Sequence, residues 1–187
     1  MAQMDNALLD RKFKPFFTLL DIDKDGAINL NDFLRPAERA RQALGWTTGD
    51  ARYLKLVQSL KAAWNQILQV QDLDKNGGIS YQEYIGLIFR LGLEWAVNGT
   101  APAWGVELSN NLKSVLDFNG DGAFTANEYA IYLRSIGSDA DAKSVFAKLD
   151  INKNGKLTFD EIQVLAKQLA GSSDPAAPGN YLLTGKF

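Results

Sequence analysis

One twelve-residue pattern of oxygen-bearing side chains occurs four times along the chain and is clearest in residues 72–83, DLDKNGGISYQE. In this stretch Asp72, Asp74 and Asn76 stand at positions 1, 3 and 5, and Glu83 stands at position 12. A hard cation such as Ca²⁺ takes about seven oxygen ligands at roughly 2.4 Å, and alternate side chains of a short loop can supply them. The spacing therefore predicts a loop that wraps a calcium ion.

The other positions of the pattern also have expected roles. Gly77, at position 6, is expected at a positive φ, which residues with a Cβ avoid. Gly78 at position 7 would offer its backbone carbonyl to the ion, and Ser80 at position 9 would hold a water. Ile79 at position 8 is expected to form a short β bridge with the same position of a paired loop. Glu83 would close the ligand shell with two oxygens.

The same pattern recurs in three other stretches, so that the chain contains loop 1 (21–32), loop 2 (72–83), loop 3 (117–128) and loop 4 (150–161). Each has Gly at position 6, and four matches make a chance acidic turn negligible. The candidate metal ligands, side chains at positions 1, 3, 5 and 12 and the backbone carbonyl at position 7, are Asp21, Asp23, Asp25, Ala27, Asp32, Asp72, Asp74, Asn76, Gly78, Glu83, Asp117, Asn119, Asp121, Ala123, Glu128, Asp150, Asn152, Asn154, Lys156 and Glu161. This pattern of residues resembles the calcium loop of the EF-hand superfamily, which is a comparatively specific sequence motif.

Apolar residues at helical spacing flank the loops, which predicts an entering and an exiting helix around each. The first entering helix is expected over residues 7–20, and its exiting partner begins near Leu30. Pro15 lies inside the first of these patterns and is expected to kink or end the helix, because proline lacks the donor of an interior turn. Pro36 raises the same question for the second helix.

Further helix boundaries are predicted from local motifs. Residues 47–50 and 138–141 resemble capping boxes, the first opening a helix that reaches Gln71 and the second a helix that enters loop 4. The exiting helix over residues 84–93 is so apolar that it is expected to be buried on most sides. Gly and Pro within residues 98–103 mark the expected boundary between two halves, 1–97 and 98–187, each with one pair of loops.

The spacing of the loops resembles a particular group within the superfamily. Loop starts are 51, 45 and 33 residues apart, whereas calmodulin-like chains space them almost evenly. The long first interval and the C-terminal residues 173–185 make nearly the whole chain similar to the sarcoplasmic calcium-binding proteins and calexcitin. The resemblance implies an all-α fold in which two pairs of EF-hands pack as one compact globule. Many members have lost ligands in one or more loops, whereas all four loops of this chain keep their ligands, so up to four bound Ca²⁺ are expected, with the number of filled sites left open.

Composition excludes several other functions. The chain has no cysteine and no histidine, so thiolate metal sites and the commonest nucleophile and base pairs cannot be built, and no enzyme is predicted. No run approaches the roughly 18 apolar residues of a membrane span. We expect a cytoplasmic monomer without a nucleic-acid partner.

The charge balance depends on the loops. Twelve of the 22 acidic residues stand at ligand positions, which leaves 10 others against 20 Lys and Arg residues. The surface outside the ligands is therefore net +10, and four bound Ca²⁺ would move the formal charge from −2 to +6. The low pI thus reflects the metal-free loops.

Two functions fit such loops: a buffer that takes up and releases Ca²⁺, and a sensor that binds a target protein or membrane once loaded. Sensors of the calmodulin type use Met-rich grooves, and this chain has only Met1 and Met4, both outside the expected hands. The composition therefore favours an intracellular buffer with Ca²⁺/Mg²⁺ exchange. A sensor remains the alternative, and four arginines between residues 35 and 52 could serve an acidic partner or form an ordinary solvated face.

Two local features refine this prediction. Asp32 closes loop 1 where the other loops have Glu, and its shorter side chain favours the smaller coordination shell of Mg²⁺. The apolar residues 181–183 near the C-terminus are predicted to lie against any cleft left between the two halves, so that Ca²⁺ binding opens no large apolar groove; a disordered tail after Pro175 and Pro178 is the alternative.

A third function, a light-emitting photoprotein, would use the same four-hand globule. Its chemistry relies on histidines, which this chain lacks, while a luciferin-binding carrier is excluded less firmly. Trp46, Trp64, Trp95 and Trp104 are interpreted as core residues.

Overall fold

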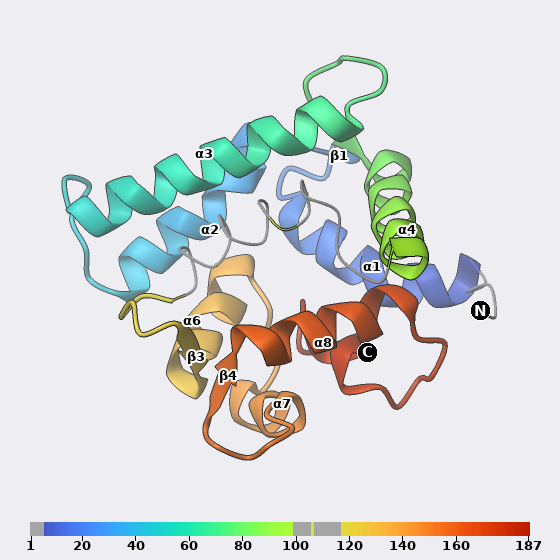
Figure 1. The fold of residues 1–187 in the computed structure, drawn as a ribbon. Coiled ribbons are helices and arrows are strands. Elements are labelled where there is room, and N and C mark those ends of the chain that lie inside the picture. The colour runs from blue at the N-terminus through green and yellow to red at the C-terminus, as the bar shows by residue number, and fades with distance from the viewer. Residues whose placement is uncertain (1–5, 99–105, 107–116) are drawn as a thin grey trace.

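The predicted loops connect helices in the computed structural model, which describes residues 6–98, 106 and 117–187 (Figure 1). In chain order the elements are α1 (Asn6–Leu20), β1 (Ala27–Ile28), α2 (Leu30–Ala43), α3 (Ala51–Gln71), β2 (Ile79–Ser80), α4 (Tyr81–Asn98), β3 (Ala123–Thr125), α6 (Ala126–Ile136), α7 (Ala142–Leu149), β4 (Lys156–Thr158), α8 (Phe159–Gly171) and the 3₁₀ helix η1 (Pro178–Tyr181). This is the all-α EF-hand fold that the sequence predicts. The helix expected before loop 3, with Leu108, Leu112, Val115 and Leu116, lies outside the described residues.

Short antiparallel strands join the loops in pairs. Ile28 of β1 lies opposite Ile79 of β2, and Phe124 of β3 lies opposite Leu157 of β4. All four side chains stand at position 8 of their loops and are buried. The predicted β bridges are therefore confirmed, and they set loop 1 beside loop 2 and loop 3 beside loop 4.

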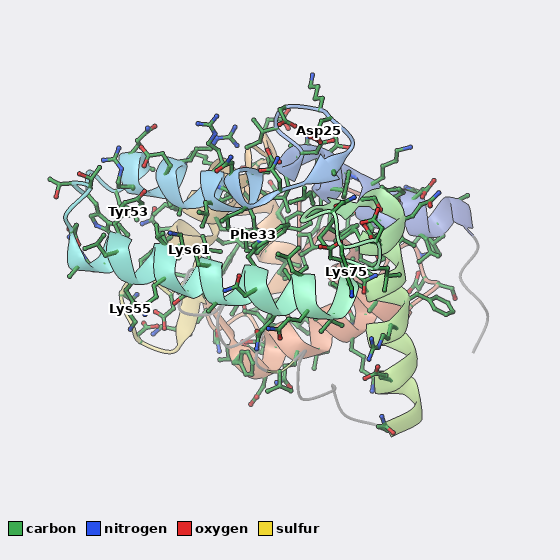
Figure 2. All side chains as sticks on the ribbon, turned by 90° about the horizontal axis from the view of Figure 1, so that it is seen from above. Asp25, Phe33, Tyr53, Lys55, Lys61 and Lys75 are labelled. Atoms are coloured by element: carbon green, nitrogen blue, oxygen red, sulfur yellow. The ribbon has the colours of Figure 1, made fainter. Side chains whose placement is uncertain are left out.

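The helices of both halves contribute to one apolar core. Phe13 of α1, Trp64 of α3, Leu133 of α6 and Leu165 of α8 belong to the same cluster of buried side chains. Helix α2 packs against α6 and α4 against α8, as the arrangement in Figure 1 shows. Figure 2 shows Phe33 between α2 and α3, where its ring centroid lies 5.3 Å from that of Trp64. Most of the expected boundary at residues 98–103 lies outside the described residues.

The tryptophans follow the prediction where they are described. Trp46 and Trp64 are 8% and 3% exposed, which confirms them as core residues, while the side chains of Trp95 and Trp104 lie outside the described set.

Neither internal proline ends its helix. A kink or an end of the helix was expected at each proline. Helix α1 continues through Pro15 and α2 through Pro36, so neither helix ends there. Packing outweighs the tendency of proline to end the helix, because Phe13 and Phe17 on either side of Pro15 are 1% and 5% exposed. Burial of each large side chain favours the continued helix by about 1.5–3 kcal/mol, comparable to the cost of an interior proline.

Both predicted capping boxes are wrong, although the helices exist. The N-cap of α3 is Asp50 and that of α7 is Asp141, and each accepts a hydrogen bond from the backbone N–H two residues on. The Ser138 hydroxyl instead donates to the carbonyl of Thr184, 2.6 Å away, which is a contact between distant parts of the chain. Helix α3 ends at Gln71, as predicted.

Helix α4 is less buried than expected. Tyr84 and Leu87 are 8% and 7% exposed, but Phe89 is 55% exposed. The helix therefore has one buried and one solvent-facing side over this part, while the side chains of Leu91 and Leu93 are not described.

The C-terminal segment, residues 178–187, packs on the helices of the second half. It lies beside α8 (Figure 1), and a Cβ on Gly179 would come within 2.2 Å of the Leu165 carbonyl oxygen, so only glycine fits there. The Tyr129 hydroxyl donates to the carbonyls of Tyr181 and Leu182 at 3.0 and 3.1 Å. Leu182 and Leu183 line a cavity together with residues of both halves, such as Phe33 and Tyr132, which agrees with the predicted position of this segment. That Ca²⁺ binding opens no apolar groove stays a prediction.

Candidate metal centres

The four loops share one backbone conformation. The glycines at position 6 have φ between +82° and +92°, which confirms the expectation for Gly77. At position 4, Lys24, Lys75 and Lys153 also have positive φ, each at +59°, and Gly120 has +73°. Left-handed lysines were not predicted, because lysine carries no preference for this conformation. The signal that could have revealed them is Gly120, which stands at the same position of loop 3.

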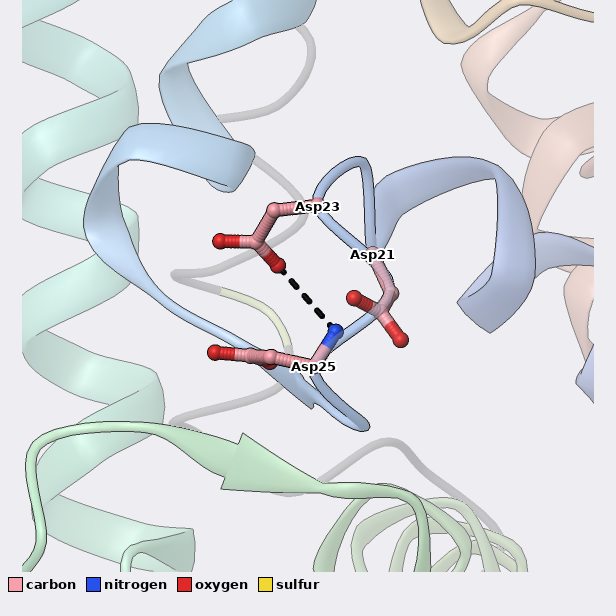
Figure 3. A group of neighbouring side chains, drawn as sticks. All are labelled: Asp21, Asp23 and Asp25. Atoms are coloured by element: carbon pink, nitrogen blue, oxygen red, sulfur yellow. Dashed lines mark hydrogen bonds between the residues drawn. The ribbon is translucent and has the colours of Figure 1, made fainter.

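Loop 1 gathers three carboxylates. Oxygens of Asp21, Asp23 and Asp25 lie within 4.8 Å of one another, and Figure 3 shows the three side chains around the turn, where the Asp25 N–H donates to Asp23. Asp21 is 9% exposed, and its Oδ1 atom has no hydrogen-bond partner among the described residues. Carboxylates this close repel one another unless a cation lies between them. The arrangement therefore fits a metal ion.

Asp32 stands apart from this group. Its two oxygens accept hydrogen bonds from the backbone N–H groups of Ile22 and Asn29, at 3.3 and 3.1 Å. No oxygen of Asp32 joins the three gathered carboxylates of loop 1. Glu83 and Glu128 also accept from two backbone N–H groups of their own loops, so these hydrogen bonds do not depend on the length of the side chain.

Loop 2 gathers carboxylates from both of its ends. Oxygens of Asp72, Asp74 and Glu83 lie within 4.8 Å of one another. Burial alone would raise the pKa of Glu83, but hydrogen bonds from Ser80 and from the Leu73 N–H outweigh it and hold the pKa below its ordinary value. Glu83 is therefore fixed as an anion at the point where the loop closes.

Position 9 has a role that the sequence interpretation missed. The hydroxyls of Ser80, Thr125 and Thr158 each donate to the Glu at position 12 of their own loop, at 2.8, 2.8 and 2.9 Å. In loops 3 and 4 the same residue is the N-cap of the exiting helix and forms a capping box with that Glu. The S/T-x-x-E spacing could have revealed these boxes.

Loop 3 has its carboxylates in a different arrangement. Asp117 accepts from the Gly122 N–H at 2.8 Å, and Glu128 accepts from the Asn119 N–H at 3.2 Å. The Asp121 carboxylate accepts from the ammonium of Lys156 in loop 4, at 3.0 Å. In this loop, all of which is described, the three carboxylates do not converge as those of loops 1 and 2 do.

Loop 4 carries two carboxylates and two amides. Asp150 is 7% exposed and accepts from the Gly155 N–H at 2.8 Å. Asn152 accepts from the Asn154 N–H at 2.9 Å. The Oε1 atom of Glu161 is buried without a hydrogen-bond partner among the described residues, although its Oε2 atom is paired with Thr158. A buried unpaired carboxylate oxygen again fits a bound cation.

The residues at position 7 are held in the same way in all four loops. The N–H groups of Ala27, Gly78, Ala123 and Lys156 donate to the side chain at position 5, at 2.8–3.1 Å. The predicted ligands of each loop therefore belong to one hydrogen-bonded turn, although the structure brings three carboxylates together only in loops 1 and 2.

Comparisons with known proteins agree with this geometry. Residues 142–166 match the family described as "EF hand", and residues 16–40 match "EF-hand domain pair". Calerythrin of Saccharopolyspora erythraea is 28% identical, over 85% of this chain and 90% of its own. Sarcoplasmic calcium-binding proteins I, III and IV of Branchiostoma lanceolatum are 26% identical over 91% and 92%, and calexcitin-1 of Caenorhabditis elegans is 25% identical over 93% and 85%.

Solved structures show the same fold. A sarcoplasmic calcium-binding protein from amphioxus has a TM-score of 0.69 at 22% identity, covering 98% of this chain and 99% of its own. The coelenterazine-binding protein of Renilla muelleri has a TM-score of 0.73 at 20% identity, covering 98% and 100%. No described helix of the chain combines the length and apolar character that crossing a membrane requires. Its loops, its fold and these relatives make the chain similar to EF-hand proteins, in particular to the sarcoplasmic calcium-binding proteins and calexcitin.

Proposed function

We propose that this chain binds up to four Ca²⁺ ions in its four loops and acts as an intracellular calcium buffer. The observation that carries the proposal is the convergence of three carboxylates in each of loops 1 and 2. The buried oxygens of Asp21 and Glu161 support it, because neither has a donor among the described residues and each would gain a cation. The sarcoplasmic relatives named above are themselves called calcium-binding proteins.

The donor set favours Ca²⁺ over softer metals. Every proposed ligand is a carboxylate, an amide oxygen or a backbone carbonyl, and the chain has no Cys or His. Hard cations with six to eight oxygen ligands suit such a site. Mg²⁺ would compete most strongly in loop 1, where Asp32 lies apart from the other carboxylates. Ca²⁺/Mg²⁺ exchange is therefore part of the proposal.

A buffer is favoured over a sensor by the apolar surfaces. The only methionines, Met1 and Met4, precede the described helices, so no Met-rich groove can form from those helices. The C-terminal segment already packs on helices α6 and α8, and the hydroxyls of Tyr129 and Tyr132 donate to its carbonyls. A target helix would have to displace it. We place the protein in the cytoplasm as a monomer, with residues 1–97 and 98–187 as its two pairs of hands.

Hydrophobic-probe fluorescence of the metal-stripped protein, followed during Ca²⁺ addition at constant Mg²⁺, tests this choice. A buffer should show a signal that falls or stays low as the loops fill. A strong rise on Ca²⁺ loading would refute the buffer and favour a sensor, for which the 55% exposed Phe89 of α4 would be a starting contact.

A cavity of about 260 Å³ favours a second candidate function, binding of a small apolar ligand. Its described lining comes from both halves and includes Phe33, Leu60, Tyr132 and Leu182. A coelenterazine-binding protein is among the similar structures, although likeness at 20% identity shows the fold alone. Native mass spectrometry of the purified protein would test this function: a retained small molecule supports it, and a bare mass that no added apolar compound changes argues against it.

A further inference from the structure

An ion pair joins the two loops of the second pair. Lys156, at position 7 of loop 4, places its ammonium 3.0 Å from the Oδ2 atom of Asp121, at position 5 of loop 3. The β3–β4 pairing makes this contact possible, because it sets Lys156 opposite Thr125 and so beside loop 3. The lysine and aspartate side chains are 51% and 36% exposed.

The pair involves the oxygen of Asp121 that a metal would need. The Oδ1 atom accepts the Ala123 N–H at 3.1 Å, which leaves Oδ2 as the oxygen without a backbone donor. In loop 1 the Oδ1 atom of the equivalent Asp25 also accepts the position-7 N–H, at 2.9 Å, and the Asp25 carboxylate converges with that of Asp21. Asp121 makes no such convergence within loop 3, all of which is described. The lysine thus holds the ligand oxygen that loop 1 leaves available.

We propose that Lys156 is an affinity-determining residue for the metal site of loop 3, acting as an internal cation that competes with Ca²⁺ for Asp121. This inference rests on the proposed calcium binding. The side chain acts on loop 3, whereas the backbone carbonyl of the same residue is a candidate ligand of loop 4. Loops 1 and 2 have Ala27 and Gly78 at the matching position, so this competition is confined to the second pair. Binding in loop 3 must release the lysine first.

Site-resolved titration of Lys156→Gln with Ca²⁺ tests the proposal. The N–H groups of Gly122 and Gly155 donate to the position-1 carboxylates of loops 3 and 4. Their resonances in ¹H–¹⁵N NMR spectra therefore report the two sites separately. An exposed ion pair contributes up to about 1 kcal/mol, so loop 3 should bind Ca²⁺ about 2- to 5-fold more tightly in the variant. Lys156→Arg keeps the charge and should retain the wild-type affinity.

Lys153→Gln is the matched control. It removes the same charge from loop 4, and its side chain is exposed and makes no ion pair with the described residues. It should tighten loop 3 clearly less than Lys156→Gln. Equal effects of the two variants, or none from Lys156→Gln, would overturn the proposal. If the wild type shows no Ca²⁺-dependent shift of Gly122, the proposed function itself fails at loop 3, which is a separate result.

A second measurement follows the lysine directly. The side-chain resonances of Lys156 should shift as loop 3 fills, because the ammonium loses Asp121. In Glu128→Gln, which weakens loop 3, that shift should be lost while the Gly155 amide still reports filling of loop 4. A Lys156 shift that follows loop 4 instead would contradict competition at loop 3.

Discussion

The hydroxyls of Tyr129 and Tyr132 are predicted to hold the C-terminal segment on the second half. Tyr129 donates to the carbonyls of Tyr181 and Leu182, and Tyr132 donates to the carbonyl of Leu183 at 2.8 Å. Burial raises the pKa of both phenols well above the ordinary value, so both remain protonated donors across the neutral range. Tyr129 has one proton, which its two carbonyl contacts share, so the double variant Tyr129→Phe/Tyr132→Phe removes two O–H donors while keeping both rings.

The expected loss follows from the two O–H donors. An intramolecular hydrogen bond contributes about 0.5–1.5 kcal/mol net, and the two donors together give about 1–3 kcal/mol. For a chain of 187 residues this corresponds to a fall in Tm of about 2–12 °C. The free segment should also uncover apolar surface of α6 and α8, which would raise the hydrophobic-probe signal of the Ca²⁺-loaded protein.

Thermal unfolding and probe fluorescence, both with saturating Ca²⁺, measure these effects. Tyr53→Phe is the matched control, since its hydroxyl donates to Glu38 at 3.2 Å, between α3 and α2 and far from the C-terminal segment in sequence. Loss of this one hydrogen bond should reduce the free energy of unfolding by no more than about 1.5 kcal/mol, with a correspondingly small fall in Tm, and should leave the probe signal low. A double variant that melts like the wild type and binds no more probe would show that these hydroxyls do not retain the segment.

Two further predictions concern single residues. Asp32→Glu should lengthen the reach of the closing carboxylate in loop 1 and shift that site from Mg²⁺ toward Ca²⁺, and unchanged preferences in competition titrations would refute the side-chain-length explanation. Lys12 donates to the carbonyls of Leu169 and Ser172 at the end of α8, and burial lowers its pKa to about 8 although Asp174 acts in the opposite direction. The unfolded chain therefore binds more protons between about pH 8 and the ordinary lysine pKa of 10.5, so over this window Lys12 should raise stability by up to about 3 kcal/mol. Urea unfolding at pH 7.5 and 10 should show this rise in the wild type relative to Lys12→Met, and parallel behaviour of the two proteins would contradict it.

The sequence predicts the loops well because their chemistry is local. The ligand spacing and the positive φ of Gly77 follow from twelve consecutive residues, and the bridge between Ile28 and Ile79 follows from the apolar residue that each loop repeats at position 8. The C-terminal packing was also predictable, from apolar residues that would otherwise remain exposed. Long-range contacts explain most of what was missed. The Ser138 hydroxyl, for example, donates to the carbonyl of Thr184, 46 residues away, instead of capping the next helix.

Pairing between loops is likewise invisible within one repeat. Nothing in the pattern of loop 3 alone indicates that Asp121 meets Lys156, because the contact depends on the register of β3 against β4. The same holds for the continued helix at Pro15, which is decided by the burial of Phe13 and Phe17 in a core shared by distant helices.

Calorimetric titration of the metal-stripped protein with Ca²⁺, with and without Mg²⁺, tests the central claim most directly. The wild type should bind four ions, and each of the variants Asp32→Asn, Glu83→Gln, Glu128→Gln and Glu161→Gln should lose one site while remaining folded by circular dichroism. Mg²⁺ should weaken the apparent Ca²⁺ affinity of at least loop 1. A stoichiometry of two or fewer in the folded wild type, or four undiminished sites in all four variants, would contradict the assignment of the loops.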